Sequence, residues 1–401
     1  MPLARTRALR VPWRLRVLLV TVPAIALLAA ALAVAPDPDA PAAVSTTPAE
    51  LSPCQPLPAA TTVDQLNLFV GALRGSGEFE GADVGADTTL QDGRRLWVFG
   101  DTLRSRDYDG QRFVRNSMLL FDPACVRVVT PADRGALVPD RKDGVGYWPM
   151  SVASIPRDGY DLVGVGLQRV KGSDAPDGPQ AFDNLGPSFA LFIVRRGGTP
   201  QLVDVEDFGR DSSDPSRPTW GAAAAVHDGW VYLYGTARPR DAAKKLVFGF
   251  SLRVARVRPD DITDTSRWQY WNGTRWQGSA SDAVQLIDAE GGVSQTLSVF
   301  EQDGRWFAVS KRDEFLGSDL VIWSAPSPTG PFTASAPLAS IPSDAGTGAL
   351  RYMPLAHPDL LPEPGTVVVS YSQNNTDLAK VADDPFLYRP RFLRVRLPDV
   401  P

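Results

Sequence analysis

The sequence has 401 residues but only two cysteines, Cys54 and Cys125, and only two histidines, His227 and His357. A zinc site of four Cys or His ligands is therefore excluded, because neither histidine lies at ligand spacing. A Ser-His-Asp triad is disfavoured too, since no nucleophile motif lies beside either histidine. Phosphate-binding loops, dinucleotide glycine fingerprints, His-Glu-x-x-His and EF-hand motifs are also absent from the sequence. We expect no cofactor and no catalytic metal, and leave open only a structural or axial calcium ion.

Long hydrophobic runs are absent beyond residue 35. Residues 1–16 contain five arginines, and residues 17–35 form a 19-residue apolar segment rich in alanine. This pattern is typical of a secretory signal peptide or of an uncleaved membrane anchor. Either would export the rest of the chain. We therefore expect a protein that is secreted or anchored to the outer face of the cytoplasmic membrane, with no other membrane contact.

An excess of positive charge is missing as well. The formal net charge of −5 becomes −10 when residues 1–35, which hold five arginines and no acid, are removed. An acidic body is a poor partner for nucleic acids and for anionic membranes. We expect neither of these partners, and we expect a monomer.

Residues 36–62 are rich in proline, alanine and threonine and have no hydrophobic period. This composition predicts an extended tether, followed by a folded domain over residues 63–401. Export makes a disulfide between Cys54 and Cys125 the expected state, which would pin the tether to the folded domain. Two free buried thiols are the alternative.

Glycine and proline make up about 17% of the chain, which favours many turns and few long helices. Five times, an apolar or small-residue run, a tight turn and a short aromatic or β-branched strand follow one another. The turn glycines, 61 to 75 residues apart, are Gly93, Gly159, Gly229, Gly304 and Gly365. Such repeated hairpins predict an all-β fold, a five-bladed β-propeller, preceded by the signal or anchor helix and the tether.

The remaining segments of the domain complete this prediction. Residues 188–196, 249–258 and 319–327 alternate between apolar and polar side chains, as outer strands do. The last strand, 391–398, is expected to close the ring by pairing with the first blade. Beyond the N-terminal segment we expect no helix, apart from a short turn near 260–266.

The first hairpin contains two aspartates that carry the functional prediction. If the hairpin folds about Asp92, Asp83 and Asp101 lie opposite each other at one end of the strands. Their repulsion would keep one carboxyl protonated as an acid and leave the other as a base or nucleophile, as in glycosidases. A purely structural pair would need a compensating cation. Asp87 is a third candidate, for substrate binding or for tuning the pair, with an exposed strand residue as the alternative.

The stretch around this pair, GADVGADTTLQDGRRLWVFGDT at 81–102, resembles a known family signature. It is similar to the first blade of the secreted bacterial family called domain of unknown function 4185, parts of which are endo-D-arabinanases of glycoside hydrolase family 183. Weaker echoes lie at 116–117, 220–221, 266–276, 327–332, 357–361 and 370–375. The resemblance implies a five-bladed propeller acting on mycobacterial-type arabinan, with Asp83 and Asp101 as the paired catalytic aspartates.

A sugar site also needs flat apolar surfaces and planar hydrogen-bonding groups. Candidates for substrate binding near the hairpin ends are Asn116, Trp148, Trp220, His357, Tyr371 and Asn374. Any single tryptophan is as readily blade core, and His357 is as readily a structural histidine. Lys311 and Arg312 are interpreted as part of a solvated face.

These observations lead to one functional hypothesis and two competitors. We expect an exported glycoside hydrolase that cleaves a furanose polysaccharide of the cell envelope, endo-acting on D-arabinan, by acid–base catalysis. The alternatives are a non-catalytic carbohydrate- or envelope-binding propeller and a scaffold for envelope proteins.

Overall fold

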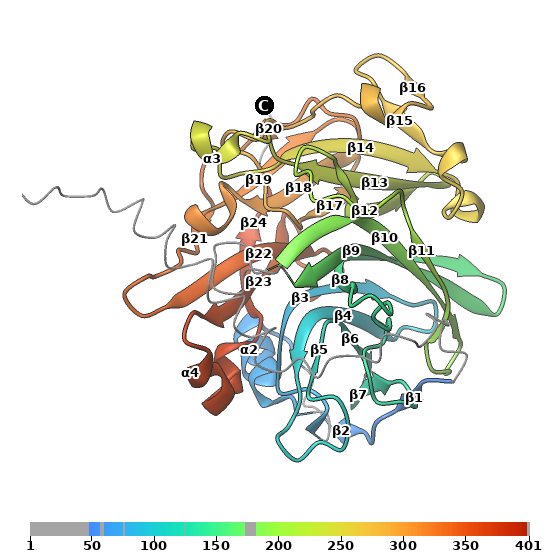
Figure 1. The fold of residues 1–401 in the computed structure, drawn as a ribbon, viewed down its shortest axis with the longest axis vertical. Helices are drawn as coiled ribbons and strands as arrows, with labels where there is room; N and C mark the ends of the chain where they lie inside the picture. Colours follow the sequence, from blue (N-terminus) through green and yellow to red (C-terminus); the bar gives the residue numbers. More distant parts are fainter. Residues whose placement is uncertain (1–47, 57–59, 75–76, 124, 173–181, 399–401) are drawn as a thin grey trace, which may run out of the picture.

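The computed structural model describes residues 48–56, 60–74, 77–123, 125–172 and 182–398. These residues form five antiparallel sheets, which follow one another round the molecule in sequence order (Figure 1). The predicted signal or anchor (1–35) and the first part of the predicted tether (36–47) lie outside the described residues.

The first two sheets contain the strands from the N-terminal half. In order from the axis outward, the first sheet consists of β3 (Gly81–Thr89), β4 (Arg95–Leu103), β6 (Ser117–Asp122), β7 (Cys125–Thr130) and β1 (Glu50–Leu51), with β5 (Phe113–Val114) on β4 and β2 (Gln55–Pro56) on β7. The second consists of β8 (Gly146–Arg157), β9 (Tyr160–Gly172), β10 (Phe182–Arg195) and β11 (Gln201–Asp207).

The other three sheets follow in the same inner-to-outer order. The third consists of β12 (Thr219–His227), β13 (Trp230–Ala237), β14 (Ser251–Val257), β15 (Gln269–Trp271) and β16 (Trp276–Gln277). The fourth consists of β17 (Ser298–Gln302), β18 (Arg305–Lys311) and β19 (Asp319–Ala325), with β20 (Thr333–Ala334) and β21 (Ala339–Ser340) on β19. The fifth consists of β22 (Ala349–His357), β23 (Thr366–Asn375) and β24 (Arg391–Arg396).

The inner strands close a ring. β3 packs against β8, β8 against β12, β12 against β17, β17 against β22, and β22 against β3. The predicted all-β propeller fold is therefore confirmed. The closing strand was predicted wrongly, because β24 pairs with β23 and not with the first sheet. The outer edge of the first sheet is instead covered by β1, near the start of the described residues.

All five predicted hairpins are present. Each predicted turn glycine has a positive φ, between 69° and 83°, which only glycine adopts readily. In the third and fourth hairpins the preceding aspartates, Asp228 and Asp303, have positive φ as well. Two consecutive residues of this kind make the tight turn that matches the twist of paired strands. The local Asp-Gly signal therefore sets these hairpins.

The stretch before residue 81 differs from the expectation. The helix α2 (Val63–Ala72) begins at Thr62, whose side chain accepts a hydrogen bond from the backbone N–H of Gln65. Leu66 and Val70 bury one face of this helix in an apolar cluster with the first sheet. The expectation of no helix was therefore wrong. Shorter helices are α3 (Ala242–Lys245), α4 (Leu378–Asp383), and the 3₁₀ turns Pro259–Asp261, Thr265–Arg267, Ala280–Asp282, Glu314–Leu316 and Pro385–Leu387. Two of these turns fulfil the prediction near 260–266.

The described part of the predicted tether is packed against the folded domain and is not a free linker. β1 and β2 both pair with β7, and Ser52 between them exchanges backbone and side-chain hydrogen bonds with Val128. The predicted disulfide between Cys54 and Cys125 is present and fixes this segment to the start of β7. Disulfides of this kind are typical of exported proteins. Among the described residues, no helix is long and apolar enough to cross a membrane.

Candidate functional site

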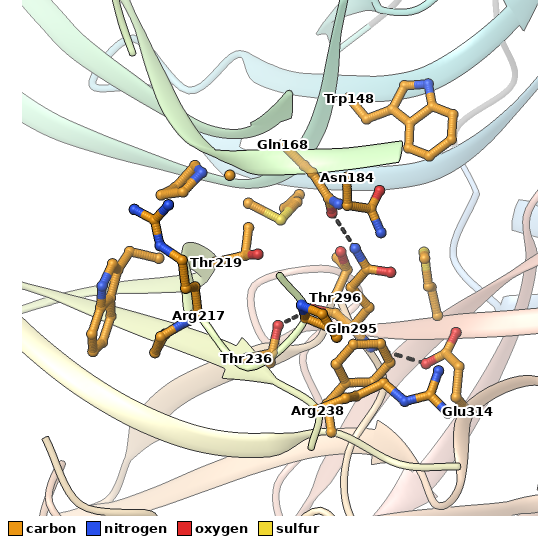
Figure 2. Close-up of a pocket in the computed structure, with 18 of the residues that line it drawn as sticks. Trp148, Gln168, Asn184, Arg217, Thr219, Thr236, Arg238, Gln295, Thr296 and Glu314 are labelled. Carbon is orange, nitrogen blue, oxygen red and sulfur yellow. Dashed lines mark hydrogen bonds between the residues drawn. The ribbon is translucent and has the colours of Figure 1, made fainter. Parts of the chain in front are cut away.

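The five sheets surround a cavity of about 870 Å³, and residues from each sheet or its connections line it (Figure 2). Aromatic side chains, among them Trp148, Phe208, Trp220 and Phe250, form much of the wall. A few polar groups interrupt this surface. Cavities of this size and composition are where proteins bind small molecules or single units of a polymer.

Backbone bulges direct side chains into the cavity. Four of the five inner hairpins have a break in strand register beside cavity-lining residues, at Ala82/Val84, Pro149/Ser151, Trp220/Ala223 and Tyr352/Leu355. A bulge bends the strand and aims a side chain away from the regular alternation. The strain is visible at Val84 and Met353, which are not glycine yet have φ of 66° and 45°.

The first of these bulges determines how the two predicted aspartates meet. Ala82 pairs with Thr102 and Val84 with Phe99, so Asp83 lies across from both Gly100 and Asp101. The prediction that Asp83 and Asp101 pair directly across a regular hairpin is therefore wrong, because the bulge shifts the register. Asp83 and Asp101 nevertheless lie together, because both line the cavity and the charge of Asp83 raises the pKa of Asp101.

Asp83 is held by hydrogen-bond donors. The Tyr352 hydroxyl donates to its Oδ2 at 2.8 Å, and the hydroxyl of Tyr388 and the backbone N–H of Asp101 also donate to the carboxyl. Burial raises the pKa of Asp83 to about 6 in spite of these donors, which favour the ionised form. The backbone of Tyr388 also accepts from Ala82, which holds the C-terminal segment against β3.

Asp101 is more deeply buried, with 8% of its surface exposed. Trp148 Nε1 donates to its Oδ1 at 2.7 Å. Burial, and then the charge of Asp83, raise the pKa of Asp101 well above its usual value, and Arg115 only partly opposes this. Arg115 itself forms an ion pair with Asp140. The two aspartates are therefore an unequal pair, with Asp101 the one that retains its proton to higher pH.

A further cavity carboxyl group with a raised pKa was missed in the sequence. Glu314 follows β18 and is 5% exposed, with Oε2 accepting from the backbone N–H of Gln295 at 3.0 Å (Figure 2). Burial raises the pKa of Glu314, and a hydrogen bond from the Ser294 hydroxyl and then the charge of Lys311 oppose the rise. Lys311 is fully buried, donates from Nζ to the carbonyl of Arg351 at 2.6 Å, and has its pKa lowered by burial to about 8. The interpretation of Lys311 as part of a solvated face was therefore wrong.

Three predicted binding residues line the cavity. Trp148 packs edge-on against Phe182, and its ring nitrogen contacts Asp101. Trp220 lies between the cavity and the core, where it packs against Tyr270. Asn374 lies on β23 at the cavity wall.

Asp87 and His357 do not line the cavity, so their predicted substrate contacts are wrong. His357 Nδ1 shares a hydrogen bond of 2.5 Å with Asp87, its Nε2 contacts Ser370 at 2.7 Å, and its ring stacks on Trp97. Asp87 also forms an ion pair with Arg95. Although burial opposes it, the charge of His357 and that of Arg95 lower the pKa of Asp87. This buried group joins the first and fifth sheets.

Asn116 and Tyr371 were also predicted to bind substrate and are placed elsewhere. Asn116 is buried and satisfies the backbone of Val138 and Tyr147 through three hydrogen bonds. Tyr371 packs in the apolar cluster between the fourth and fifth sheets. Neither side chain is among those that line the cavity, since Asn116 lies between β5 and β6 and Tyr371, on β23, packs in that cluster.

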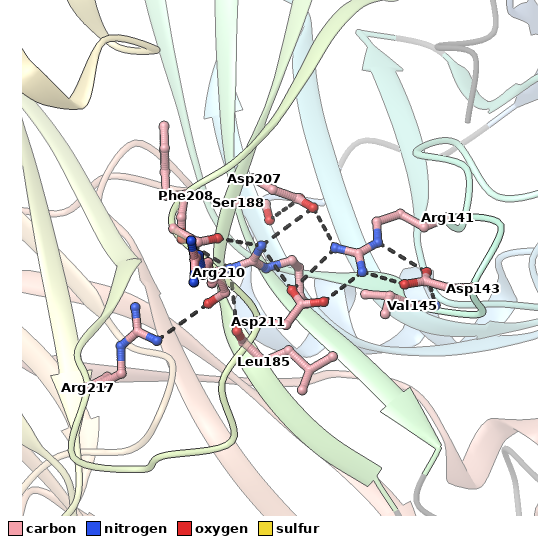
Figure 3. A network of polar contacts seen from close by, with 12 residues as sticks. Arg141, Asp143, Val145, Leu185, Ser188, Asp207, Phe208, Arg210, Asp211 and Arg217 are labelled. Atoms are coloured by element: carbon pink, nitrogen blue, oxygen red, sulfur yellow. Dashed lines mark hydrogen bonds and ion pairs between the residues drawn. The ribbon is translucent and has the colours of Figure 1, made fainter. Parts of the chain in front are cut away.

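A network of ion pairs supports one wall of the cavity (Figure 3). Arg169, on β9, donates to the carbonyls of Phe208 and Gly209 and contacts Asp211, and Arg141 contacts both Asp207 and Asp211 at 2.6–2.8 Å. The loop held in this way runs from β11 to β12 and supplies lining residues 208–209, 212–215 and 217–218 on that side.

The described residues contain no cluster of three or more His, Cys, Asp or Glu side chains placed to hold a metal ion. Six carboxyl groups line the cavity among aromatic and amide side chains, those of Asp83, Asp101, Asp183, Asp214, Asp313 and Glu314. Of these, Asp83, Asp101 and Glu314 have raised pKa values.

Residues 68–397 match the family described as a domain of unknown function, DUF5005. The resemblance to the domain of unknown function 4185 family is thereby overturned. The resemblance depended mainly on one hairpin motif, and the other similarities were weak. Among curated proteins, none matches the sequence.

Solved structures share the fold. The chain is similar to a candidate hydrolase from Bacteroides ovatus, at 18% identity and a TM-score of 0.62, over 90% of this chain and 96% of the other. It is also similar to the catalytic domain of a GH62 α-L-arabinofuranosidase from Coprinopsis cinerea, at 12% identity and a TM-score of 0.45, over 89% and 98% of the chains. At this identity, the likeness to the Bacteroides ovatus structure shows a common fold and not a common reaction.

Proposed function

The chain belongs to the DUF5005 family, and we propose that it is a glycoside hydrolase in which Asp83 and Asp101 carry out acid–base catalysis. One observation carries this proposal. Two carboxyl groups with unequal, raised pKa values lie side by side on the wall of an aromatic-lined cavity. Pairs of carboxyl groups whose surroundings separate their pKa values are the acid and base of glycoside hydrolysis.

The surroundings of the two aspartates favour a different catalytic role for each. Burial and the neighbouring charge of Asp83 favour the protonated form of Asp101, which makes Asp101 the general acid that protonates the leaving oxygen. Asp83 accepts hydrogen bonds from two tyrosines and is the ionised partner, a base or nucleophile. Trp148 fixes the orientation of Asp101 through its N–H group and offers its ring to the sugar.

The substrate class follows from the cavity and from export. Aromatic walls suit the apolar faces of sugar rings, and a disulfide-bonded propeller behind a predicted signal segment would meet the polysaccharides of the cell envelope. The narrower expectation of D-arabinan came from the overturned resemblance. Arabinan is therefore one test substrate among several furanose and pyranose polymers.

The test is the release of oligosaccharides from arabinogalactan, arabinan, xylan and galactan by the purified protein. Asp83→Asn and Asp101→Asn are each expected to lower kcat at least about 100-fold while the circular dichroism spectrum stays native. Asp303→Asn, at an exposed turn, is the matched control. If the intact protein binds a polymer without releasing product, the protein is a carbohydrate-binding propeller and the hydrolase proposal is wrong.

A further inference from the structure

The wall of the cavity formed by the second and fourth sheets carries polar atoms that lack well-formed hydrogen bonds. Glu314 Oε1 and Gln168 Nε2 are fully buried, and neither makes a hydrogen bond of normal geometry with a described residue. Both side chains line the cavity, and their residues are 5% and 2% exposed. A buried polar atom without a well-formed hydrogen bond is unfavourable, so a ligand that supplies one is favoured.

These two side chains are joined across the axis. The Gln295 side chain donates to Gln168 Oε1, and the backbone N–H of Gln295 donates to Glu314 Oε2 (Figure 2). One atom of each group is thus used to hold it in place, and the other atom is left for the cavity. Such an arrangement fixes both groups before any ligand arrives, which lowers the entropy cost of binding.

The backbone at Glu314 is strained. Asp313 and Glu314 have φ of 60° and 49°, in the left-handed region that residues other than glycine rarely adopt. Such conformations are unfavourable and persist where surrounding structure enforces them. Lys311, buried beside Glu314 and bound to the carbonyl of Arg351, is part of that enforcement. The chain therefore holds the Glu314 carboxyl at this wall at a cost to stability.

We propose that Glu314 and Gln168 form a binding subsite for two neighbouring hydroxyl groups of one sugar unit of the substrate. This proposal rests on the proposed function and names the hydroxyl-recognising part of the same cavity. Glu314 Oε1 accepts a hydrogen bond from one hydroxyl, and Gln168 Nε2 donates to the oxygen of the other. Hydroxyls serve both roles, whereas an ester, a methyl ether or an apolar ligand would leave Glu314 without a donor.

The position of the subsite relative to the aspartate pair is set by the second sheet. Gln168 pairs directly with Trp148 in the register of β8 and β9, and Trp148 contacts Asp101. A sugar unit bound by Glu314 and Gln168 therefore lies along the wall next to the acid. The two residues are specificity-determining groups, and neither takes part in proton transfer to the glycosidic oxygen.

The test separates binding from catalysis. Arabino-, xylo- and galacto-oligosaccharides are titrated against Asp101→Asn protein, with the fluorescence of Trp148 and calorimetry as readouts. In this background, Glu314→Gln and Gln168→Met are each expected to weaken binding of the best oligosaccharide about tenfold. The controls Glu206→Gln, on the exposed face of β11, and Gln201→Met, which contacts only Ala49 and Thr199, leave binding unchanged.

A deoxygenated analogue makes the assignment specific. The oligosaccharide that lacks the hydroxyl recognised by Glu314 is expected to bind equally to the Asp101→Asn protein with and without Glu314→Gln. The loss of affinity from the missing hydroxyl and the loss from the substitution then do not add. In the active protein, Glu314→Gln raises KM about tenfold and changes kcat less than threefold.

Several results would overturn the subsite. They are unchanged binding in both variants, additive losses with the deoxy analogue, no binding of any oligosaccharide at millimolar concentration, or a 100-fold fall in kcat at constant KM in Glu314→Gln. The last result would place Glu314 in the chemistry. Weaker binding in the variants, combined with no cleavage of any polymer by the intact protein, would support the subsite and contradict only the hydrolase function.

Discussion

Gly100 lies directly against the side chain of Asp83, such that a Cβ atom at position 100 would be 2.4 Å from Asp83 Oδ1. The close approach is possible only because residue 100 has no side chain. The bulge that brings Asp83 towards Asp101 thus depends on a glycine in the facing strand. This glycine precedes Asp101 directly, so one short segment supplies both an acid and the space for its partner.

Gly100→Ala is accordingly expected to displace the Asp83 carboxyl without unfolding the propeller. A displacement of about 1 Å at a catalytic group costs roughly 100-fold in rate, so kcat/KM should fall by about that factor. Steady-state kinetics on the polymer that the protein cleaves best would measure this. The matched control is Gly71→Ala, in α2, where an added Cβ meets nothing within 4 Å. Activity within threefold of native in Gly100→Ala would contradict the assigned role of Asp83.

Asp83→Asn is expected to stabilise the protein at neutral pH. The folded state raises the pKa of Asp83 from 3.8 to about 6, so the folded protein binds this proton more tightly than the unfolded chain. Stability from this group is therefore greatest below pH 4 and is lost as pH rises through 6. Two effects reduce the gain, because the Asp83 side chain is partly in contact with the cavity and the substitution weakens one hydrogen bond. The variant should therefore gain roughly 1–2 kcal/mol in the free energy of unfolding at pH 7.5.

Urea unfolding at pH 7.5 and at pH 4 measures this difference, which should shrink at the lower pH. Asp303→Asn, at an exposed turn, should change neither value. A loss of stability at pH 7.5 would mean that Asp83 is held by its partners more strongly than burial opposes it.

Asp87→Ala is expected to have the opposite effect on stability and little effect on turnover. The variant leaves Arg95 and His357 without their buried partner, which costs about 3–5 kcal/mol at neutral pH. Because the folded state lowers the pKa of Asp87, its contribution is present above pH 4 and is lost as the pH falls below that. Urea unfolding measures the loss, and kcat of the folded fraction should stay within threefold of native. A 100-fold fall in kcat would instead mean that Asp87 belongs to the functional site.

The hairpins could be predicted from the sequence because their signals are local. Asp228-Gly229 and Asp303-Gly304 are turn dipeptides, and the strands beside them alternate visibly. The helix α2 and its N-terminal cap Thr62 were harder to predict than the hairpins, because a short helix gains its stability from packing on distant strands. The strands β1 and β2 are two residues each, too short to have a pattern at all.

The site was predicted in part for the same reason. Asp83 and Asp101 belong to one hairpin, and their separation along the chain brings them together even though a bulge changes the register. Glu314 lies in a 3₁₀ turn after the second strand of the fourth hairpin, whereas Asp101 lies within β4, so the position of Asp101 gave no direct signal for Glu314. His357 gave no such signal, because its partner Asp87 is 270 residues away in the sequence.

Tyr352→Phe tests the division of roles between the two aspartates. The Tyr352 hydroxyl donates to Asp83 at 2.8 Å and so favours its ionised form. Without this donor the pKa of Asp83 rises further above 6. If Asp83 must be ionised for catalysis, the acidic limb of the pH profile of kcat/KM moves to higher pH. The measurement is that profile from pH 4 to 9, with Tyr371→Phe, outside the cavity, as the control whose limbs stay in place. A limb that moves instead to lower pH would assign the ionised role to Asp101.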